Sequence, residues 1–128
     1  MSADTLCWTD IPVTNLDRAI KFYSAVLGQK VSKMSEGGMS YGLLPHEEQN
    51  ASGCLCVSSD SVGTGNKPSQ SGPLIYLSVD GRLDDAVEAA RVSGGKVLQE
   101  KHAIGPHGFR AVIIDSEGNR IALHSSTA

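Results

Sequence analysis

The chain has 128 residues, of which 40% are hydrophobic and 20% charged, and its formal net charge at pH 7 is -3. This length and composition are typical of one compact unit, or of two small modules that share a core. The negative charge argues against a nucleic-acid binder or a protein of anionic membrane surfaces, and no apolar run approaches the roughly 20 residues that span a bilayer. We therefore expect no nucleic-acid and no membrane partner.

The amino-terminal residues and the cysteines indicate a cytoplasmic protein. The sequence "MSADTLCWTD" has no basic start and no apolar core, so it predicts no secretory signal. The three cysteines, Cys7, Cys54 and Cys56, show no spacing of a disulfide framework, which favours reduced thiols. The pair Cys54 and Cys56 has one intervening residue, unlike a C-x-x-C motif, and we expect both to point to one face and to pack there.

The first elements along the chain are a strand and an amphipathic helix. Residues 8–13 carry a strand pattern, and apolar residues recur at helical spacing from Leu16 to Leu27. Asn15 can cap this helix by accepting a hydrogen bond from a first-turn N–H, and Gly28 can end it in the left-handed conformation. Further strands are predicted at 30–34, 39–44 and 53–58.

A second copy of the same pattern follows a polar segment. Residues 59–72 are rich in Ser, Gly and Pro and predict a flexible linker. Beyond it lie a strand at 74–79 and a helix whose apolar stripe includes Leu83, Val87 and Ala90. The sequence "DSEGN" predicts a hairpin turn. The remaining strands are predicted at 96–101, 108–115 and 120–125.

The two halves repeat each other at an offset of about 66 residues, which indicates an internal duplication. Val13 corresponds to Val79, and "GQKV" corresponds to "GGKV". One βαβββ module cannot bury both faces of its sheet, whereas two side by side can. We expect an α+β fold with modules at 1–58 and 73–128, whose sheets form a half-open barrel around a cavity with the helices outside.

Two stretches, "DIPVTNLDRAIKFYSAVLG" and "GPHGFRAVIIDSEGNRIALHS", resemble the vicinal oxygen chelate superfamily. This superfamily includes glyoxalase I, extradiol dioxygenases and the fosfomycin and bleomycin resistance proteins. The chain looks most like its small bacterial glyoxalase-related members. The resemblance implies the βαβββ fold over nearly the whole chain and a homodimer, because superfamily members are commonly homodimers.

The resemblance also implies where a metal would bind. Metal-dependent members carry His, Glu or Gln early in the first strand and late in the last strand of each module. These positions fall here on Trp8, Leu74 and Ala122, and in the first module near Cys54 or Leu55. A single thiolate does not make a stable site. We therefore expect no superfamily metal site and no cofactor.

Five residues are candidates for lining the cavity: Trp8, Asp10, Tyr76, Arg110 and His124. Strand alternation places Asp10 on the face of Trp8 and places His124 on the face of Ala122. The aromatic residues can stack on a planar ligand, Arg110 can hold a carboxylate or phosphate, and Asp10 and His124 can move protons. The plain alternatives are core packing for Trp8, a hydrogen bond to backbone or to Arg110 for Asp10, and a solvent-facing strand end for Arg110. For His124 the alternative is a position near the strand end with a bond to backbone or solvent.

Two functions remain open from the sequence. The first is a protein of the glyoxalase and bleomycin-resistance type that binds a small, planar or hydrophobic molecule in a metal-free cavity. The second is a lyase, isomerase or dioxygenase of the same superfamily. It would use Asp10 and His124 as metal-free acid–base groups, or a non-standard metal site that recruits His46, Glu47 or His107.

Overall fold

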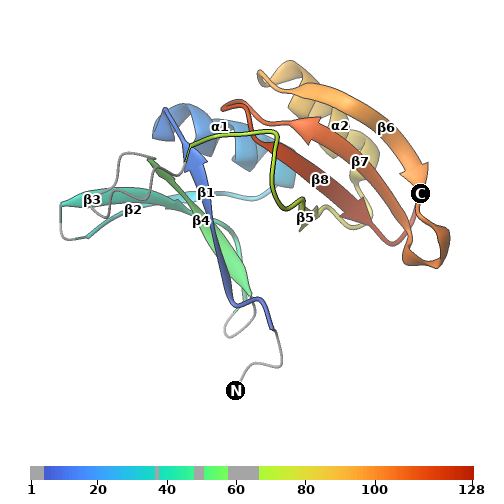
Figure 1. Cartoon of the computed structure of the whole chain (residues 1–128), viewed down its shortest axis with the longest axis horizontal. Coiled ribbons are helices and arrows are strands. Elements are labelled where there is room, and N and C mark those ends of the chain that lie inside the picture. The colour runs from blue at the N-terminus through green and yellow to red at the C-terminus, as the bar shows by residue number, and fades with distance from the viewer. Residues whose placement is uncertain (1–4, 37, 48–50, 58–66) are drawn as a thin grey trace.

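The computed structural model describes residues 5–36, 38–47, 51–57 and 67–128. Each half of the chain folds as a strand, a helix and three strands (Figure 1). The first module contains β1 (Trp8–Val13), α1 (Leu16–Leu27), β2 (Ser32–Glu36), β3 (Met39–Leu43) and β4 (Ser52–Val57). The second contains β5 (Ile75–Ser78), α2 (Leu83–Val92), β6 (Lys96–Ala103), the short 3-10 turn Gly105–His107, β7 (Phe109–Ile114) and β8 (Arg120–Ser125).

The two modules have the same sheet topology, which confirms the fold predicted from the duplication. Strand order is β1-β4-β3-β2 in the first sheet and β5-β8-β7-β6 in the second. In each sheet the first strand runs parallel to the last, and the other pairs are antiparallel. The two sheets remain separate and do not close into a barrel (Figure 1).

The helices and the adjoining sheet faces form one core shared by both modules. Alternate residues of β1 and β8, among them Ile11, Val13 and Leu123, are buried in the same cluster as Phe22 and Tyr23 of α1. The opposite sheet faces are more open, and Trp8 and Tyr76 are both exposed there. Packing therefore fixes one face of each sheet and leaves the other available for binding.

Helix α1 begins and ends at the predicted residues. The Asn15 side chain accepts a hydrogen bond from the Arg18 N–H, as expected for an N-cap. Gly28 adopts a φ of 68°, the left-handed conformation that closes the helix. The following strand occupies 32–36 instead of the predicted 30–34, because the chain first leaves this left-handed turn before it can pair with β3.

A second stabilisation of α1 comes from the other module. The carboxylate of Glu117, in the turn between β7 and β8, accepts hydrogen bonds from the N–H groups of Thr14 and Asn15 and from the Arg18 guanidinium. Its side chain is fully buried. Burial raises the pKa of Glu117, but the bonds from Arg18, Asn15, Ser116 and Thr14 outweigh it and lower the pKa to about 2.

Two neighbours of Glu117 complete this connection between the modules. Buried Asp115 accepts a hydrogen bond from the Tyr23 hydroxyl of α1, and burial raises the pKa of Tyr23 well above its usual value. The Asn119 amide donates to the Pro12 carbonyl over 2.8 Å and also donates to Asp115. We call residues 115–119 the clasp, because their side chains join the second module to β1 and α1 of the first.

The predicted linker, 59–72, falls partly outside the described residues, which resume at Lys67. From there to the start of β5 the chain has neither helix nor strand. Ser69 is hydrogen-bonded to Asn119 and Arg120, and the Gly72 carbonyl accepts from the Arg120 guanidinium over 2.9 Å. This part of the segment is thus attached to the clasp and to the start of β8.

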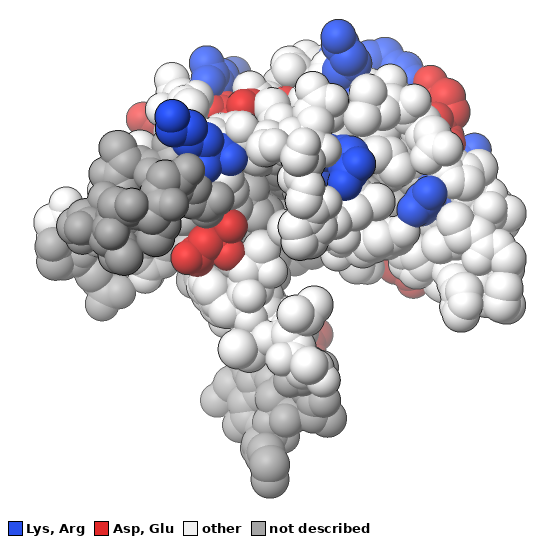
Figure 2. Space-filling model, viewed as in Figure 1, with Lys and Arg blue, Asp and Glu red and all other residues white. Residues whose placement is uncertain are grey.

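Charged residues are dispersed over the described surface. On the face drawn in Figure 2, Lys and Arg stand singly or in small groups among uncharged residues, and that face has no continuous basic area. No helix of the described chain is long and apolar enough to cross a bilayer.

Candidate functional site

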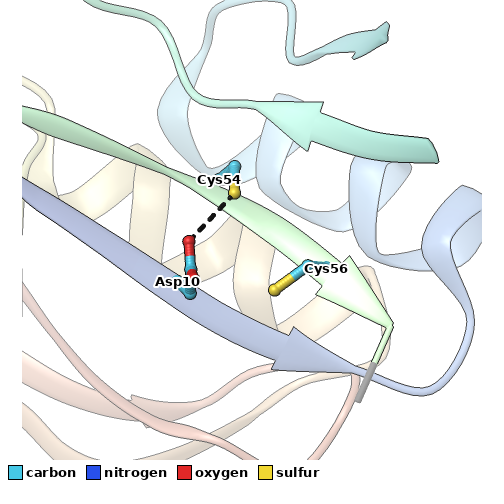
Figure 3. Close-up of side chains that lie close together, drawn as sticks. All are labelled: Asp10, Cys54 and Cys56. Atoms are coloured by element: carbon cyan, nitrogen blue, oxygen red, sulfur yellow. Dashed lines mark hydrogen bonds between the residues drawn. The ribbon is translucent and has the colours of Figure 1, made fainter. Parts of the chain in front are cut away.

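The open face of the first sheet brings together a carboxylate and two thiols (Figure 3). Asp10 comes from β1 and lies opposite Cys54 of β4 in the parallel ladder. The Cys54 thiol donates to Asp10 Oδ1 over 3.3 Å, and the Trp8 indole N–H donates to the same oxygen over 3.2 Å. Cys56 lies two residues further along β4, so alternation directs its side chain to the same face.

The Cys54 thiol is protonated at neutral pH. Its side chain is buried, and this burial, together with the hydrogen bond to Asp10 and the charge of that carboxylate, raises the pKa of Cys54 to about 12. Asp10 is exposed and Cys56 is half-buried. The group can therefore be reached from solvent, but Cys54 is not a nucleophile in this state.

The open face of the second sheet carries a different set of side chains. The Arg110 guanidinium donates from Nη1 to the Tyr76 hydroxyl and from Nε to His102 Nε2 over 3.2 Å. Its central carbon lies 5.9 Å from the centre of the Tyr76 ring, within cation–π range. The rings of Tyr76 and His124 meet edge to face with centroids 6.4 Å apart.

The hydrogen bonds define the tautomers of the two histidines on this face. His124 Nε2 lies 2.6 Å from the His107 carbonyl, which can only accept, so Nε2 carries a proton and, in the neutral ring, Nδ1 is the acceptor. His102 Nδ1 faces the Glu100 carbonyl at 2.9 Å, so it donates and leaves Nε2 to accept from Arg110. Arg110 Nη2 has no hydrogen-bond partner within the part of the chain that the structure describes.

The strand registers show which positions correspond in the two modules. Asp10 lies opposite Cys54, and Tyr76, its counterpart in the second module, lies opposite Ala122. Cys54 is therefore the equivalent of Ala122, which decides between the two positions, Cys54 and Leu55, that the sequence left open. By the same register Cys56 is the equivalent of His124.

An open cleft separates the first strands of the two modules. It has a volume of ≈ 1140 Å³. Its lining includes Leu6, residues of β1, the segments 44–47 and 51–52, and residues 73–78. Trp8 and Tyr76 face it with 45% and 47% of their surface exposed. Asp10, Arg110 and His124 are not on its lining.

The five predicted site residues thus fall into two groups. Trp8 and Asp10 contact each other in the first module, and Tyr76 contacts both Arg110 and His124 in the second. Within the described residues Asp10 accepts hydrogen bonds from Trp8 and Cys54, and not from backbone or Arg110, the alternative that the sequence left open. No described contact joins it to His124.

Sequence reasoning missed three participants, Cys54, Cys56 and His102. The sequence places Cys54 near a superfamily metal position but otherwise predicts that Cys54 and Cys56 pack, and it assigns His102 no role. The C-x-C spacing indicates that both thiols share one face of a strand. Placing Asp10 beside them also requires knowing that β1 is the neighbouring strand. Likewise, only the pairing of β6 with β7 brings His102 to Arg110.

A protein-family model covers residues 5–123: the Glyoxalase/Bleomycin resistance protein/Dioxygenase superfamily. The chain belongs to this superfamily. A Glyoxylase-like domain-containing protein from Didymella fabae is 31% identical over 116 residues, which cover 89% of this chain and 88% of that protein.

Solved structures of superfamily members share the fold. A glyoxalase/bleomycin resistance protein/dioxygenase family enzyme from Burkholderia phytofirmans matches with a TM-score of 0.71 at 16% identity, covering 96% of this chain and 99% of that one. A glyoxalase I mutant from Zea mays matches with a TM-score of 0.69 at 20% identity, covering 98% of this chain and 47% of that one. At these identities the likeness concerns the fold alone.

The superfamily's metal positions do not fit a metal in this chain. Trp8, Leu74 and Ala122 offer no suitable lone pair, and only Cys54 provides a donor. Within residues 5–36, 38–47, 51–57 and 67–128, one group of three potential ligands is close enough to share an ion, and it contains neither His46, Glu47 nor His107. The recruitment of those three, which the sequence left open, has no geometric basis in the described chain.

Proposed function

We propose that this protein binds a small, planar molecule with an acidic substituent in the cleft between its two modules, without a superfamily metal. The observation that carries the proposal is the pair of half-exposed rings, Trp8 and Tyr76, which both line the ≈ 1140 Å³ cleft. Aromatic side chains bind flat molecules by offset or edge contacts over a large apolar area. The volume is somewhat above the usual range for a small-molecule site, so the cleft has room for such a ligand.

Specificity for an acidic substituent is supported by Arg110. Its guanidinium is bonded to the Tyr76 hydroxyl, and therefore stands beside one wall of the cleft. The bonds to Tyr76 and His102 hold the guanidinium plane in place, so little side-chain entropy is lost when Nη2 binds an anion. The Tyr76 hydroxyl accepts from Arg110 and can still donate its own proton to a ligand.

An acid–base enzyme of the same superfamily is a second candidate. It is favoured by His124, whose Nδ1 is an acceptor while Nε2 is held by the His107 carbonyl. A neutral imidazole held in this way can take a proton from a bound substrate. Asp10 is hydrogen-bonded in the other module, and such an enzyme would rely on His124 and Tyr76.

We also propose that the protein functions as a homodimer. Outside the cleft, the sheets expose large apolar side chains that a second copy can cover: Met34, Met39 and Leu98. Sedimentation equilibrium tests this proposal, and a monomer at micromolar concentration contradicts it.

Calorimetric titration tests the binding function directly. Naphthoate, a planar acid, should bind to the protein with heat exchange, and naphthamide, its uncharged analogue, should bind more weakly. Tyr76→Ala should weaken naphthoate binding about tenfold, the value of one aromatic contact. Val92→Ala, at the end of α2, 72% exposed and not on the cleft lining, serves as the matched control and should bind as the wild type does. Equal affinity of the wild type and Tyr76→Ala contradicts the proposal.

A further inference from the structure

Asp10, Cys54 and Cys56 converge on one point of the first sheet. Their ligand atoms all lie within 4.8 Å of one another (Figure 3). We propose that these three side chains form a binding site for a thiophilic divalent cation, with Zn²⁺ as the principal occupant. The proposal is independent of what binds in the cleft, since none of the three residues lines it.

The geometry is close to that of a tetrahedral zinc site. Zn–S bonds of about 2.3 Å place two thiolates about 3.8 Å apart, and Zn–O bonds are about 2.1 Å. The ligand atoms are at present 3.3 Å apart for Cys54 and Asp10 and at most 4.8 Å apart for the other pairs. Small rotations about the side-chain bonds bring them into range, while the parallel ladder between β1 and β4 keeps the backbone fixed.

Binding is a substitution of protons by the cation. Two thiols lose their protons to solvent and the carboxylate loses none, so Zn²⁺ with two thiolates and one carboxylate gives a site of net charge −1. No oxidant or reductant takes part. The cation replaces the hydrogen bond that now joins the Cys54 thiol to Asp10, and buried Cys54 gains a charged partner in exchange.

The donor set determines the class of cation. Thiolates select Zn²⁺ and similar soft ions over Mg²⁺ and Ca²⁺, which prefer oxygen ligands. The Trp8 indole N–H, 3.2 Å from Asp10 Oδ1, orients the carboxylate in the way that outer hydrogen bonds orient metal ligands. Since all three ligands lie on one open sheet face, the fourth position is available to water or to an added ligand.

This site differs from the superfamily's metal site. It lies within one module and shares only Cys54 with the superfamily positions, which otherwise fall on Trp8, Leu74 and Ala122. The second module provides an internal comparison, because its equivalents of the three residues are Tyr76, Ala122 and His124, which contain no thiol.

Cobalt titration tests the proposal. Untagged, metal-free, reduced protein is titrated anaerobically with Co²⁺, which reports tetrahedral thiolate coordination by charge-transfer and visible absorption bands, and Zn²⁺ is then added as competitor. We expect saturation at about one equivalent per chain and displacement of cobalt by zinc. Cys7→Ser, which removes the exposed cysteine, should give the same spectrum.

Variants identify the ligands. Cys56→Ser should weaken Co²⁺ binding about a hundredfold or more and reduce the charge-transfer intensity, while Asp10→Asn should weaken binding and keep that intensity. Asp85→Asn, an exposed carboxylate on α2, is the control for the charge change. Thermal unfolding of each metal-free variant verifies its fold. Absence of thiolate bands in the wild type, or an unchanged titration of Cys56→Ser, overturns the proposal.

Discussion

In the first module, the positions on the open sheet face carry a carboxylate and two thiols, whereas the equivalent positions of the second carry a phenol and an imidazole, with a guanidinium beside them. The helix-facing positions differ far less and join one apolar core. Packing therefore keeps the two sheets alike only on the faces that contact the helices. On the other side the two copies have acquired different chemistry, in keeping with function residing in sites placed on a common fold.

The comparison can be tested first through the thiols, where we expect the largest effect. The pKa of about 12 against an ordinary 9 leaves Cys54 with far less thiolate than a free cysteine at neutral pH. In the metal-free protein, iodoacetamide should modify exposed Cys7 at least a hundredfold faster than Cys54. Peptide mass spectrometry over a time course measures both rates, and similar rates contradict this description of the first module.

The shared scaffold can be disrupted through the clasp. Glu117→Ala removes the acceptor for the Thr14 and Asn15 N–H groups, so it should lower the free energy of unfolding by about 2 kcal/mol. Urea unfolding measures this change. Glu100→Ala, which removes an exposed carboxylate paired with Arg91, should change stability by less than about 0.5 kcal/mol. Equal effects of the two substitutions contradict the clasp.

The role of the Arg110 guanidinium in the second module can be tested by substitution. Arg110→Met should weaken naphthoate binding about tenfold, because a charge-assisted hydrogen bond to the ligand is lost. The same substitution should leave naphthamide binding within about twofold, since no charge is involved. Calorimetry with both ligands gives the two ratios. A parallel loss for both ligands indicates general disruption of the site and contradicts the assigned role.

The smallest effect is the pH dependence of the clasp. The folded-state pKa of Glu117, about 2, lies below its ordinary value of 4.5, so folding is favoured by ionisation of this group. Its contribution is complete above pH 4.5 and is lost as the pH falls towards 2. The stability difference between the wild type and Glu117→Gln should therefore be constant above pH 5 and shrink below 4.5. A difference that is independent of pH contradicts this reasoning.

Much of the fold could be predicted because its signals are local. The helical spacing of apolar residues, Asn15 and Gly28 located α1, and the repeat located its partner. The start of β2 could not be predicted, because it depends on pairing with β3. The clasp was not foreseen either, since nothing near Glu117 in the sequence indicates that its carboxylate contacts a helix about a hundred residues away.

The candidate site was predictable only in part. Alternation along single strands put Trp8, Asp10 and Tyr76 on open faces, and the structure brings Trp8 to Asp10 and Tyr76 to Arg110. Contacts across strands depend on register, which no single strand encodes. For this reason the grouping of Asp10 with Cys54 became visible only in the folded chain.

Moving the three donor residues from the first module to the second tests most directly whether equivalent sheet positions can form an equivalent metal site. In the variant Tyr76→Asp, Ala122→Cys, His124→Cys, the second module receives the three donors of the first at equivalent positions. Cobalt titration, with unfolding curves to verify the fold, should then saturate at about two equivalents per chain, against about one in the wild type. An unchanged stoichiometry in the folded variant would contradict the account, because identical donors on an equivalent lattice would have failed to make an equivalent site.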